Sequence, residues 1–161
     1  MFYLGIDVAK NKLDCALLDA STSKIKSKMV TNDAPGFVML RQWLKKQKAE
    51  APHVVMEPTG VYHESAAFFF SDAGLTISFV NPAQIRSFAH GIGVKTKTDK
   101  KDSEVLARYG NTQKPEAWVP PPASARMLKA LLARRDAVAD DLQREKNRGD
   151  QPAFSDVILR H

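Results

Sequence analysis

The order of apolar segments is the feature that most constrains what this chain can fold into. Three short β-prone segments come first, and polar turns at residues 10–12 and 21–23 separate them. After residue 31, apolar residues at helical spacing alternate with short apolar runs at 53–57 and 75–80. The resulting order, βββαβαβα, predicts a mixed five-stranded sheet that is covered by helices.

Propensity and turn signals give the expected elements. Strands are expected at residues 2–8, 13–19, 25–31, 53–57 and 75–80. Helices are expected after residue 33, where Phe37, Leu40, Trp43 and Leu44 recur at helical spacing, and at 62–72, from 81 onward and at 100–109. Asn32 and Asp33 offer a helix cap ahead of Pro35, and Gly74 is typical of a helix end.

A proline-rich stretch divides the chain. Residues 118–122 read Trp-Val-Pro-Pro-Pro and form neither a helix nor a central strand. Beyond them, apolar residues keep the three-four spacing of a coiled-coil seam, at Leu128, Leu131, Val138 and Leu142. We therefore expect a domain at residues 1–115, a connector at 116–122 and the start of a basic helical coil at 123–161, through which the chain forms a homo-oligomer.

Composition narrows the classes of function. Lys and Arg total 24 against 18 Asp and Glu, a formal net charge of +6, and a basic surface favours polyanions such as nucleic acids. The sequence has no apolar run long enough to cross a bilayer and no signal peptide, so a cytoplasmic location is expected. The single cysteine, Cys15, excludes an internal disulfide and a cysteine-based zinc site, and its strand-like surroundings indicate a buried thiol.

Four acids stand at the ends of expected elements. Asp7 and Glu57 each end an apolar strand, where a carboxylate carries a large desolvation cost unless a positive charge compensates it. Asp99 and Asp102 lie three residues apart at the start of a helix, so their side chains can point the same way. A salt bridge or a helix cap explains each acid alone. Together they indicate a site for Mg²⁺, a hard cation that selects oxygen ligands.

Lysines surround the helical pair of acids. Acids that hold a metal, beside lysines that hold phosphates, suit phosphodiester chemistry, in which two metals about 4 Å apart activate a nucleophile and stabilise the leaving oxygen. The expected nucleic-acid contacts are Lys10, Lys95, Lys97, Lys100 and Lys101, with Arg126, Arg134 and Arg135 in the terminal helix. For that helix, a solvated face and a dimer seam are the alternatives.

Four ordered motifs carry a resemblance to a known family. They lie at residues 5–10 around Asp7, 56–62 around Glu57, 80–82 and 97–102. Together they resemble the DEDD-type insertion-sequence transposases related to the Piv DNA invertase, whose members include bridge-RNA-guided recombinases. The resemblance runs from about residue 2 to residue 145.

This resemblance implies an RNase H-like, RuvC-like domain in which Asp7, Glu57, Asp99 and Asp102 match the family's four acids and bind Mg²⁺ or Mn²⁺. It also implies action on DNA in transposition or site-specific inversion, a guide RNA as partner, and a C-terminal domain that supplies a nucleophilic serine. No such domain is visible in the 161 residues, so we expect a cloned domain or a truncated gene product. Ser103 stands where the family usually has alanine.

Three other functions compete with this one. A stand-alone structure-specific nuclease of the junction-resolvase type shares the fold and the metal chemistry. A non-catalytic nucleic-acid-binding module would use the lysines, while the acids formed salt bridges. An actin-like sugar kinase also has an acid at the end of its first strand, but it requires two such domains and a glycine-rich phosphate loop, which this sequence lacks.

Overall fold

The computed structural model describes residues 1–93 and 99–149, with side chains at 99–101, 123–130, 133, 136 and 147–149 outside the description. The chain divides into two compact units, residues 1–120 and 121–161. No helix among the described residues is both long enough and apolar enough to cross a membrane.

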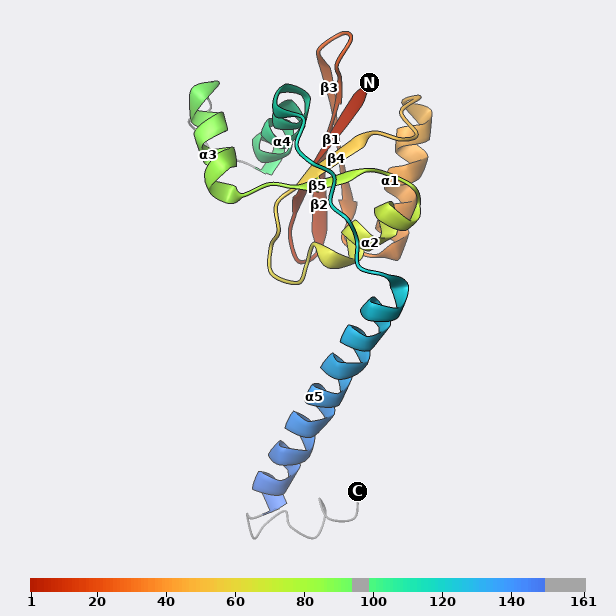
Figure 1. The fold of residues 1–161 in the computed structure, drawn as a ribbon, viewed down its shortest axis with the longest axis vertical. Helices are drawn as coiled ribbons and strands as arrows, with labels where there is room; N and C mark the ends of the chain where they lie inside the picture. Colours follow the sequence, from red (N-terminus) through yellow and green to blue (C-terminus); the bar gives the residue numbers. More distant parts are fainter. Residues whose placement is uncertain (94–98, 150–161) are drawn as a thin grey trace. The chain divides into compact units, whose positions relative to one another are not determined.

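The first unit contains one mixed sheet and four helices among its described residues (Figure 1). The elements are β1 (Phe2–Val8), β2 (Lys12–Asp19), β3 (Lys24–Thr31), α1 (Ala34–Lys46), β4 (His53–Met56), α2 (Glu64–Asp72), β5 (Ile77–Phe79), α3 (Pro82–Gly91) and α4 (Asp99–Gln113). The strands lie in the order β3-β2-β1-β4-β5. The predicted five-stranded mixed sheet is therefore confirmed.

Two kinds of strand pairing build this sheet. β1, β2 and β3 form an antiparallel meander, in which Gly5 pairs with Ala16 and Leu17 with Lys26. β4 joins the other edge of β1 in parallel, and β5 joins β4 in parallel. Since β1 lies in the middle, its side chains are largely buried on both faces, which explains its almost continuous apolar sequence.

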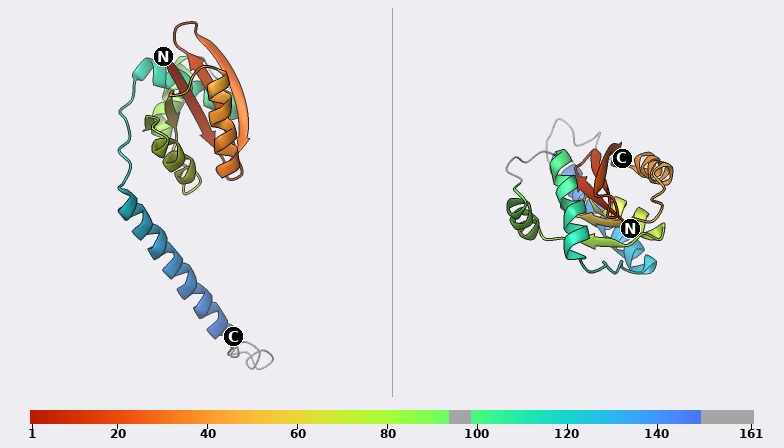
Figure 2. Two further views of the ribbon diagram at one scale, coloured as in Figure 1. Left: turned by 90° about the vertical axis from the view of Figure 1, so that its right-hand side faces the viewer. Right: turned by 90° about the horizontal axis from the view of Figure 1, so that it is seen from above.

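The helices cover the two faces of the sheet separately (Figure 2). α1 and α2 pack on the face that carries Leu4 and Ile6, and Phe37, Leu40 and Phe70 fill this side of the core. As the sequence predicts, Asp33 caps α1, because its Oδ1 accepts a hydrogen bond from the Gly36 amide at 2.8 Å. α3 and α4 pack on the opposite face.

α4 lies unusually close to β1. A Cβ atom on Gly5 would stand 2.0 Å from the Ser103 carbonyl oxygen and 2.6 Å from the Ala107 amide nitrogen. Further along, a Cβ atom on Gly110 would stand 3.0 Å from Cδ1 of Tyr3. Successive residues of β1 thus meet successively earlier turns of α4, so the helix runs antiparallel to the strand. Its N-terminus therefore lies toward the carboxyl end of β1.

Residues 114–120 continue along the outer edge of β5. The Trp118 amide donates a hydrogen bond to the Ile77 carbonyl at 2.6 Å, and the Trp118 ring packs against Phe68 and Phe79. The buried Ser78 hydroxyl donates to the Glu116 carbonyl at 2.6 Å. Ser78 has a single proton, so the His53 Nε2–H must donate to Ser78 Oγ, at 2.7 Å. This segment protects the edge of the sheet from further pairing.

The protonation of His53 makes the stability of the first unit depend on pH. Partial burial lowers the pKa of His53 below its ordinary 6.5, so the unfolded chain binds a proton at a higher pH than the folded one. The part of the stability that depends on neutral His53 is thus fully present above pH 6.5, and it is lost as the pH falls through the lower pKa of the folded state. We expect a loss below about 1 kcal/mol, since the ring keeps contact with water. Urea unfolding at several pH values should show a shallower pH dependence in His53→Gln, which keeps a donor for Ser78 but does not titrate.

The described part of the second unit contains one helix, α5 (Ala123–Gly149). Its apolar residues Leu131, Val138 and Leu142 are 57%, 51% and 62% exposed. The side chain of Leu128 lies outside the described residues. The helix is as predicted, while the coiled coil and the domain boundaries stay predictions.

Candidate metal centre

The parallel pairing of β1 and β4 brings Asp7 and Glu57 to the same edge of the sheet. Ile6 pairs with Met56, so the next residue of each chain segment is one of the two acids. Gly5 and Val55, two residues earlier, both face α4, as the Cβ directions and the core contacts show. Because side chains alternate along a strand, Asp7 and Glu57 also belong to the α4 face. Both carboxylates are half-buried.

α4 brings Asp102 to this edge. The adjacent residue, Ser103, is buried against Gly5, and Asp102 is half-buried in the first turns of the helix. Asp99 is the first residue of the helix, and its side chain lies outside the described residues. The N-terminal end of a helix carries a partial positive charge, which favours carboxylates there. The antiparallel course of α4 thus places the start of the helix beside the two strand ends.

Asp14 is an acid near this edge that sequence reasoning missed. It is the direct partner of Asp7 across the β1–β2 pair, so the two side chains lie on the same face of the sheet. Lys12 forms an ion pair with Asp14, at 3.4 Å between Nζ and Oδ2. Asp14 also lines a shallow pocket of about 240 Å³ with Met29 and Ser103. If the first two predicted strands had been paired residue by residue across the turn at residues 9–11, Asp14 would have been identified as the partner of Asp7.

The loop after Glu57 turns sharply and then leads into α2. Gly60 has a φ of +61°, a left-handed conformation that glycine adopts without strain. The helix starts at Glu64, two residues later than predicted, because the Thr59–His63 segment forms its own turn first. The Asn32 side chain contacts this loop, and sequence reasoning considered Asn32 only as a helix cap.

The donor set fits a hard divalent cation by its chemistry. Carboxylate oxygens are the ligands that Mg²⁺ and Mn²⁺ select, and Asp7, Glu57 and Asp102 lie on segments that end at one edge of the sheet. Among the side chains that the structure describes, which exclude Asp99, no three Asp, Glu, His or Cys residues stand close enough together to hold an ion. The ligand set therefore stays a prediction.

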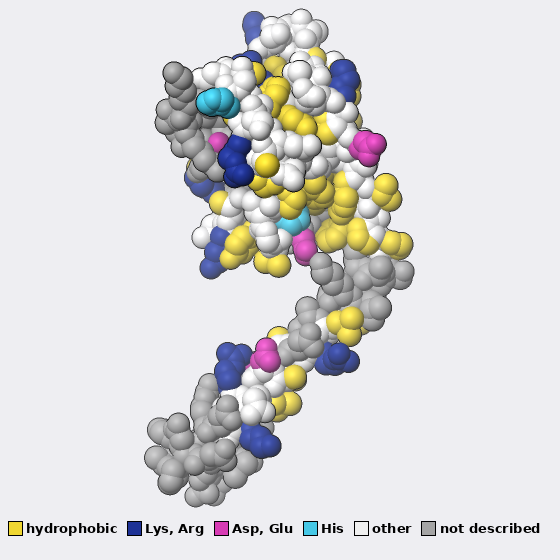
Figure 3. Space-filling view, turned by 60° about the vertical axis from the view of Figure 1, so that its left-hand side comes forward, with side chains coloured by type: hydrophobic (Ala, Val, Ile, Leu, Met, Phe, Trp, Pro, Cys, Tyr) yellow, Lys and Arg dark blue, Asp and Glu magenta, His cyan; other side chains and the backbone are white. Residues whose placement is uncertain are grey.

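The expected nucleic-acid contacts are only partly described. Lys10, Arg134 and Arg135 are exposed. Lys95 and Lys97, together with the side chains of Lys100, Lys101 and Arg126, lie outside the described residues. Figure 3 shows the molecule from the side of α3, and on it the described basic side chains of the first unit stand apart from one another rather than forming one patch.

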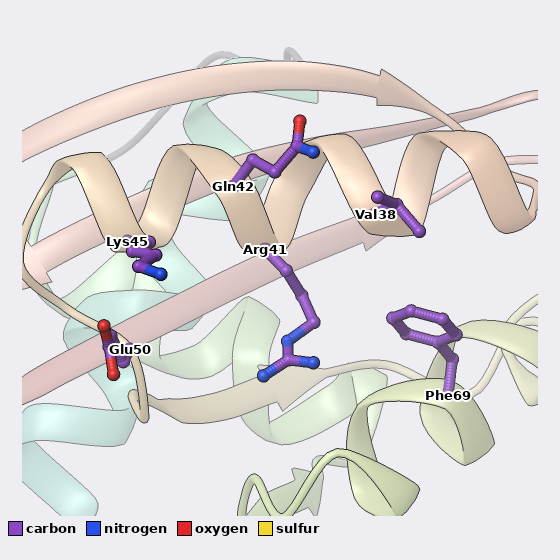
Figure 4. Close-up of a pocket in the computed structure, with 6 residues that line it drawn as sticks. All are labelled: Val38, Arg41, Gln42, Lys45, Glu50 and Phe69. Carbon is purple, nitrogen blue, oxygen red and sulfur yellow. The ribbon is translucent and has the colours of Figure 1, made fainter.

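A separate pocket lies on the opposite face of the sheet, between α1 and α2. It has a volume of about 340 Å³, and Arg41, Lys45, Glu50 and Phe69 are among its lining residues. Arg41 reaches from α1 into the space beside Phe69 of α2 (Figure 4). The sheet separates this pocket from Asp7, so it is not part of the candidate metal centre.

Cys15 has no place in the chemistry of this site. Its thiol is buried, and burial raises its pKa well above the ordinary range. The prediction of a buried thiol is confirmed.

Comparison with solved structures shows which fold this is. The chain is similar to the Thermus thermophilus RuvC structures, one of them in complex with a Holliday junction substrate, with a TM-score of 0.53 and 12% sequence identity. The match covers 73% of this chain and 99% of the RuvC chain in the complex. The fold is therefore RuvC-like, as the resemblance implied.

Comparison of sequences shows the family. Two pilin gene-inverting proteins, from Moraxella lacunata and Moraxella bovis, are each 32% identical over 166 residues and match 99% of this chain. The chain spans about half of their length, 51% in each case. The family model for DEDD transposases of the IS110 type matches residues 4–151. The chain belongs to this transposase family.

Proposed function

We propose that this chain is the metal-binding part of a DNA transposase or site-specific recombinase. Asp7, Glu57, Asp99 and Asp102 would hold Mg²⁺ or Mn²⁺, which would supply the Lewis-acid chemistry for cleavage of DNA phosphodiester bonds. The observation that carries the proposal is the convergence of two parallel strand ends and one helix start at a single edge of the sheet. Membership of a transposase family supports the choice of DNA as substrate.

The residues of the chain have distinct tasks in this proposal. The carboxylates hold the cations, which supply a Lewis acid and a nucleophile activated at neutral pH. The partial burial of Asp7, Glu57 and Asp102 keeps the site less hydrated than bulk water, which strengthens their attraction for a cation. Lys10, which lies between β1 and β2 three residues after Asp7, and the lysines around Asp99 contact the phosphates of the bound strand.

Partners of the whole protein extend this proposal. A guide RNA and a second copy of the chain, joined through α5, complete the assembly. The Moraxella relatives are named for gene inversion and are about twice as long as this chain, so a further domain contributes to strand exchange. Arg126, Arg134 and Arg135 of α5 contact nucleic acid in this assembly.

A titration with Mn²⁺ tests the metal site. We expect the ion to raise the melting temperature of the wild-type chain, by the equivalent of about 2.7 kcal/mol at a hundredfold excess over Kd. Asp102→Asn should abolish this increase. The same change should stabilise the metal-free protein by roughly 1 kcal/mol, since it removes one like charge from converging acids. Asp141→Asn in α5, a change of equal charge, is the control.

The opposite result would remove the metal from the proposal. A wild-type chain that neither binds Mn²⁺ nor gains stability from it, yet still binds DNA, is a nucleic-acid-binding module. An Asp102→Asn variant that loses stability without metal and keeps its affinity for Mn²⁺ shows that Asp102 serves the fold instead.

A stand-alone junction nuclease is the second candidate, and one observation favours it. The structural match covers 99% of the RuvC chain, so this chain contains nearly the whole of that fold. Metal-dependent cleavage of four-way DNA junctions by the chain alone would support this function. Binding of the junction without cleavage would favour the transposase proposal, in which another domain is required.

A further inference from the structure

We propose that Asn32 is a positioning residue that fixes the Glu57 segment against the end of β1 and so sets the separation of the Asp7 and Glu57 carboxylates. The inference rests on the proposed function, because it concerns the same acids. Asn32 lies outside the four motifs that resemble the family. It follows β3 directly and precedes Asp33, the N-cap of α1.

The Asn32 side chain joins two segments that are far apart in the sequence. Its Nδ2 donates a hydrogen bond to the Ala9 carbonyl at 2.8 Å and another to the Tyr62 carbonyl at 2.9 Å. Both partners are acceptors, so the amide can face them only with its NH₂ group. Asn32 therefore uses both of its side-chain donors as a bridge between the β1–β2 turn and the loop before α2.

Each end of this bridge lies close to a proposed metal ligand. Ala9 follows Asp7 by two residues and comes directly after β1. Tyr62 follows Glu57 by five residues, in a loop that is closed by its own hydrogen bonds, from the Tyr62 amide to the Thr59 carbonyl and from the Thr59 amide to His63 Nδ1. Because the loop is cross-linked in this way, a displacement of Tyr62 would be transmitted toward Glu57.

The position of Asn32 is itself well fixed. Its backbone amide donates to the Asn11 carbonyl at 3.0 Å, and the next residue starts α1 through its capping hydrogen bond. The His63 ring also fixes the loop, because it packs edge-to-face against Phe79 with ring centroids 5.2 Å apart. Asn32 thus holds the loop against the junction between β3 and α1.

The burial of the Asn32 Oδ1 atom indicates why an amide side chain stands at this position: its two N–H groups are both used as donors. Its Oδ1 is buried and has no hydrogen-bond partner among the described residues. A buried acceptor without a partner is unfavourable, and an apolar side chain of similar size would avoid it. Such a side chain would leave the Ala9 and Tyr62 carbonyls without their donor. The geometry therefore favours a side chain with two N–H groups.

A merely structural role is the alternative, and a matched pair of variants separates the two. Asn32→Ala removes both hydrogen bonds of the bridge. Asp33→Ala, at the next residue, removes the α1 cap and so weakens the same junction without touching the loop. Two quantities are measured on each full chain: the affinity for Mn²⁺ and the hydrogen-exchange rate of residues 57–64 in the metal-free protein.

We expect Asn32→Ala to reduce the Mn²⁺ affinity roughly ten- to a hundredfold, as changes to groups that orient metal ligands do. The same variant should speed exchange across residues 57–64. Asp33→Ala should lower the melting temperature while leaving both quantities at wild-type values. If Asn32→Ala does not fold, Asn32→Ser, which keeps one donor, should show the same changes at smaller size.

Two results would overturn the proposal. One is a hydrogen-exchange rate of residues 57–64 that is the same in the Asn32 variants as in the wild type. The other is an equal loss of Mn²⁺ affinity in Asp33→Ala, which would show that any weakening of the junction has this effect. If the wild-type chain binds no Mn²⁺, the proposed function fails by itself, and the exchange rates still decide whether Asn32 holds the loop.

Discussion

Replacement of Gly5 by alanine should be among the most destabilising single-methyl changes in this chain. The added Cβ would stand 2.0 Å from the Ser103 carbonyl oxygen and 2.6 Å from the Ala107 amide nitrogen, and both are backbone atoms of α4. A flexible side chain could turn away, but a helix backbone can relieve the clash only by moving as a whole. We expect a loss of about 3 kcal/mol or more, at the upper end of the range for overpacked cores. Thermal or urea unfolding measures it.

Gly91→Ala is the matched control for this prediction. Gly91 is the last residue of α3, and a Cβ there would meet no atom within 4 Å. Alanine is the better helix former by up to about 1 kcal/mol, so this variant should be as stable as the wild type or slightly more so. If Gly5→Ala and Gly91→Ala had the same free energy of unfolding, α4 would not pack this closely on β1.

The Gly5 variant also connects the fold to the candidate site. α4 carries Asp102 one residue before Ser103, the residue that the added methyl would push away. Any folded Gly5→Ala protein should therefore bind Mn²⁺ more weakly, because Asp102 moves away from the strand that carries Asp7. The close approach of α4 to β1 is thus a requirement of the site as well as of the core.

The sequence predicted the sheet well because its signals are local. The apolar run of β1 and the polar turn that follows it set the ends of this strand, and its predicted range, residues 2–8, is the observed one. The N-cap of α1 and the end of α2 at Gly74 followed from side-chain and backbone chemistry within a few residues. The short strand β5 was predicted two residues too early and one too late, because its apolar run continues beyond the paired residues.

The parts of the site that sequence reasoning missed depend on register and packing. Asp14 lies beside Asp7 only because of the pairing across one particular hairpin. Asn32 contacts Tyr62 across 30 positions, and nothing in its neighbours' residue types indicates that contact. Asp7 and Glu57 were easier to identify, since each follows an apolar, strand-like run, and the family resemblance indicated which acids to consider.

The largest expected functional effect comes from the two strand-end acids. Asp7→Asn and Glu57→Gln each keep the shape of the side chain and remove its charge. If the proposed cations hold the reacting phosphate, loss of one ligand removes several kcal/mol of transition-state stabilisation, and about 4 kcal/mol corresponds to roughly a thousandfold in rate. We expect strand cleavage or strand exchange, and Mn²⁺ binding with it, to fall by at least that order. Glu50→Gln, in the pocket on the opposite face, should leave both unchanged.

The double variant Asp7→Asn/Glu57→Gln gives the sharper form of this prediction. Groups that act as one unit show strongly non-additive effects, so a site already emptied by one substitution loses little more with the second. The double variant should therefore be about as impaired as either single one. If the rate of the double variant fell by the product of the two single losses, the two carboxylates would act independently, each through its own contacts. That outcome would contradict a shared ion, even though both acids lie at the same edge of the sheet.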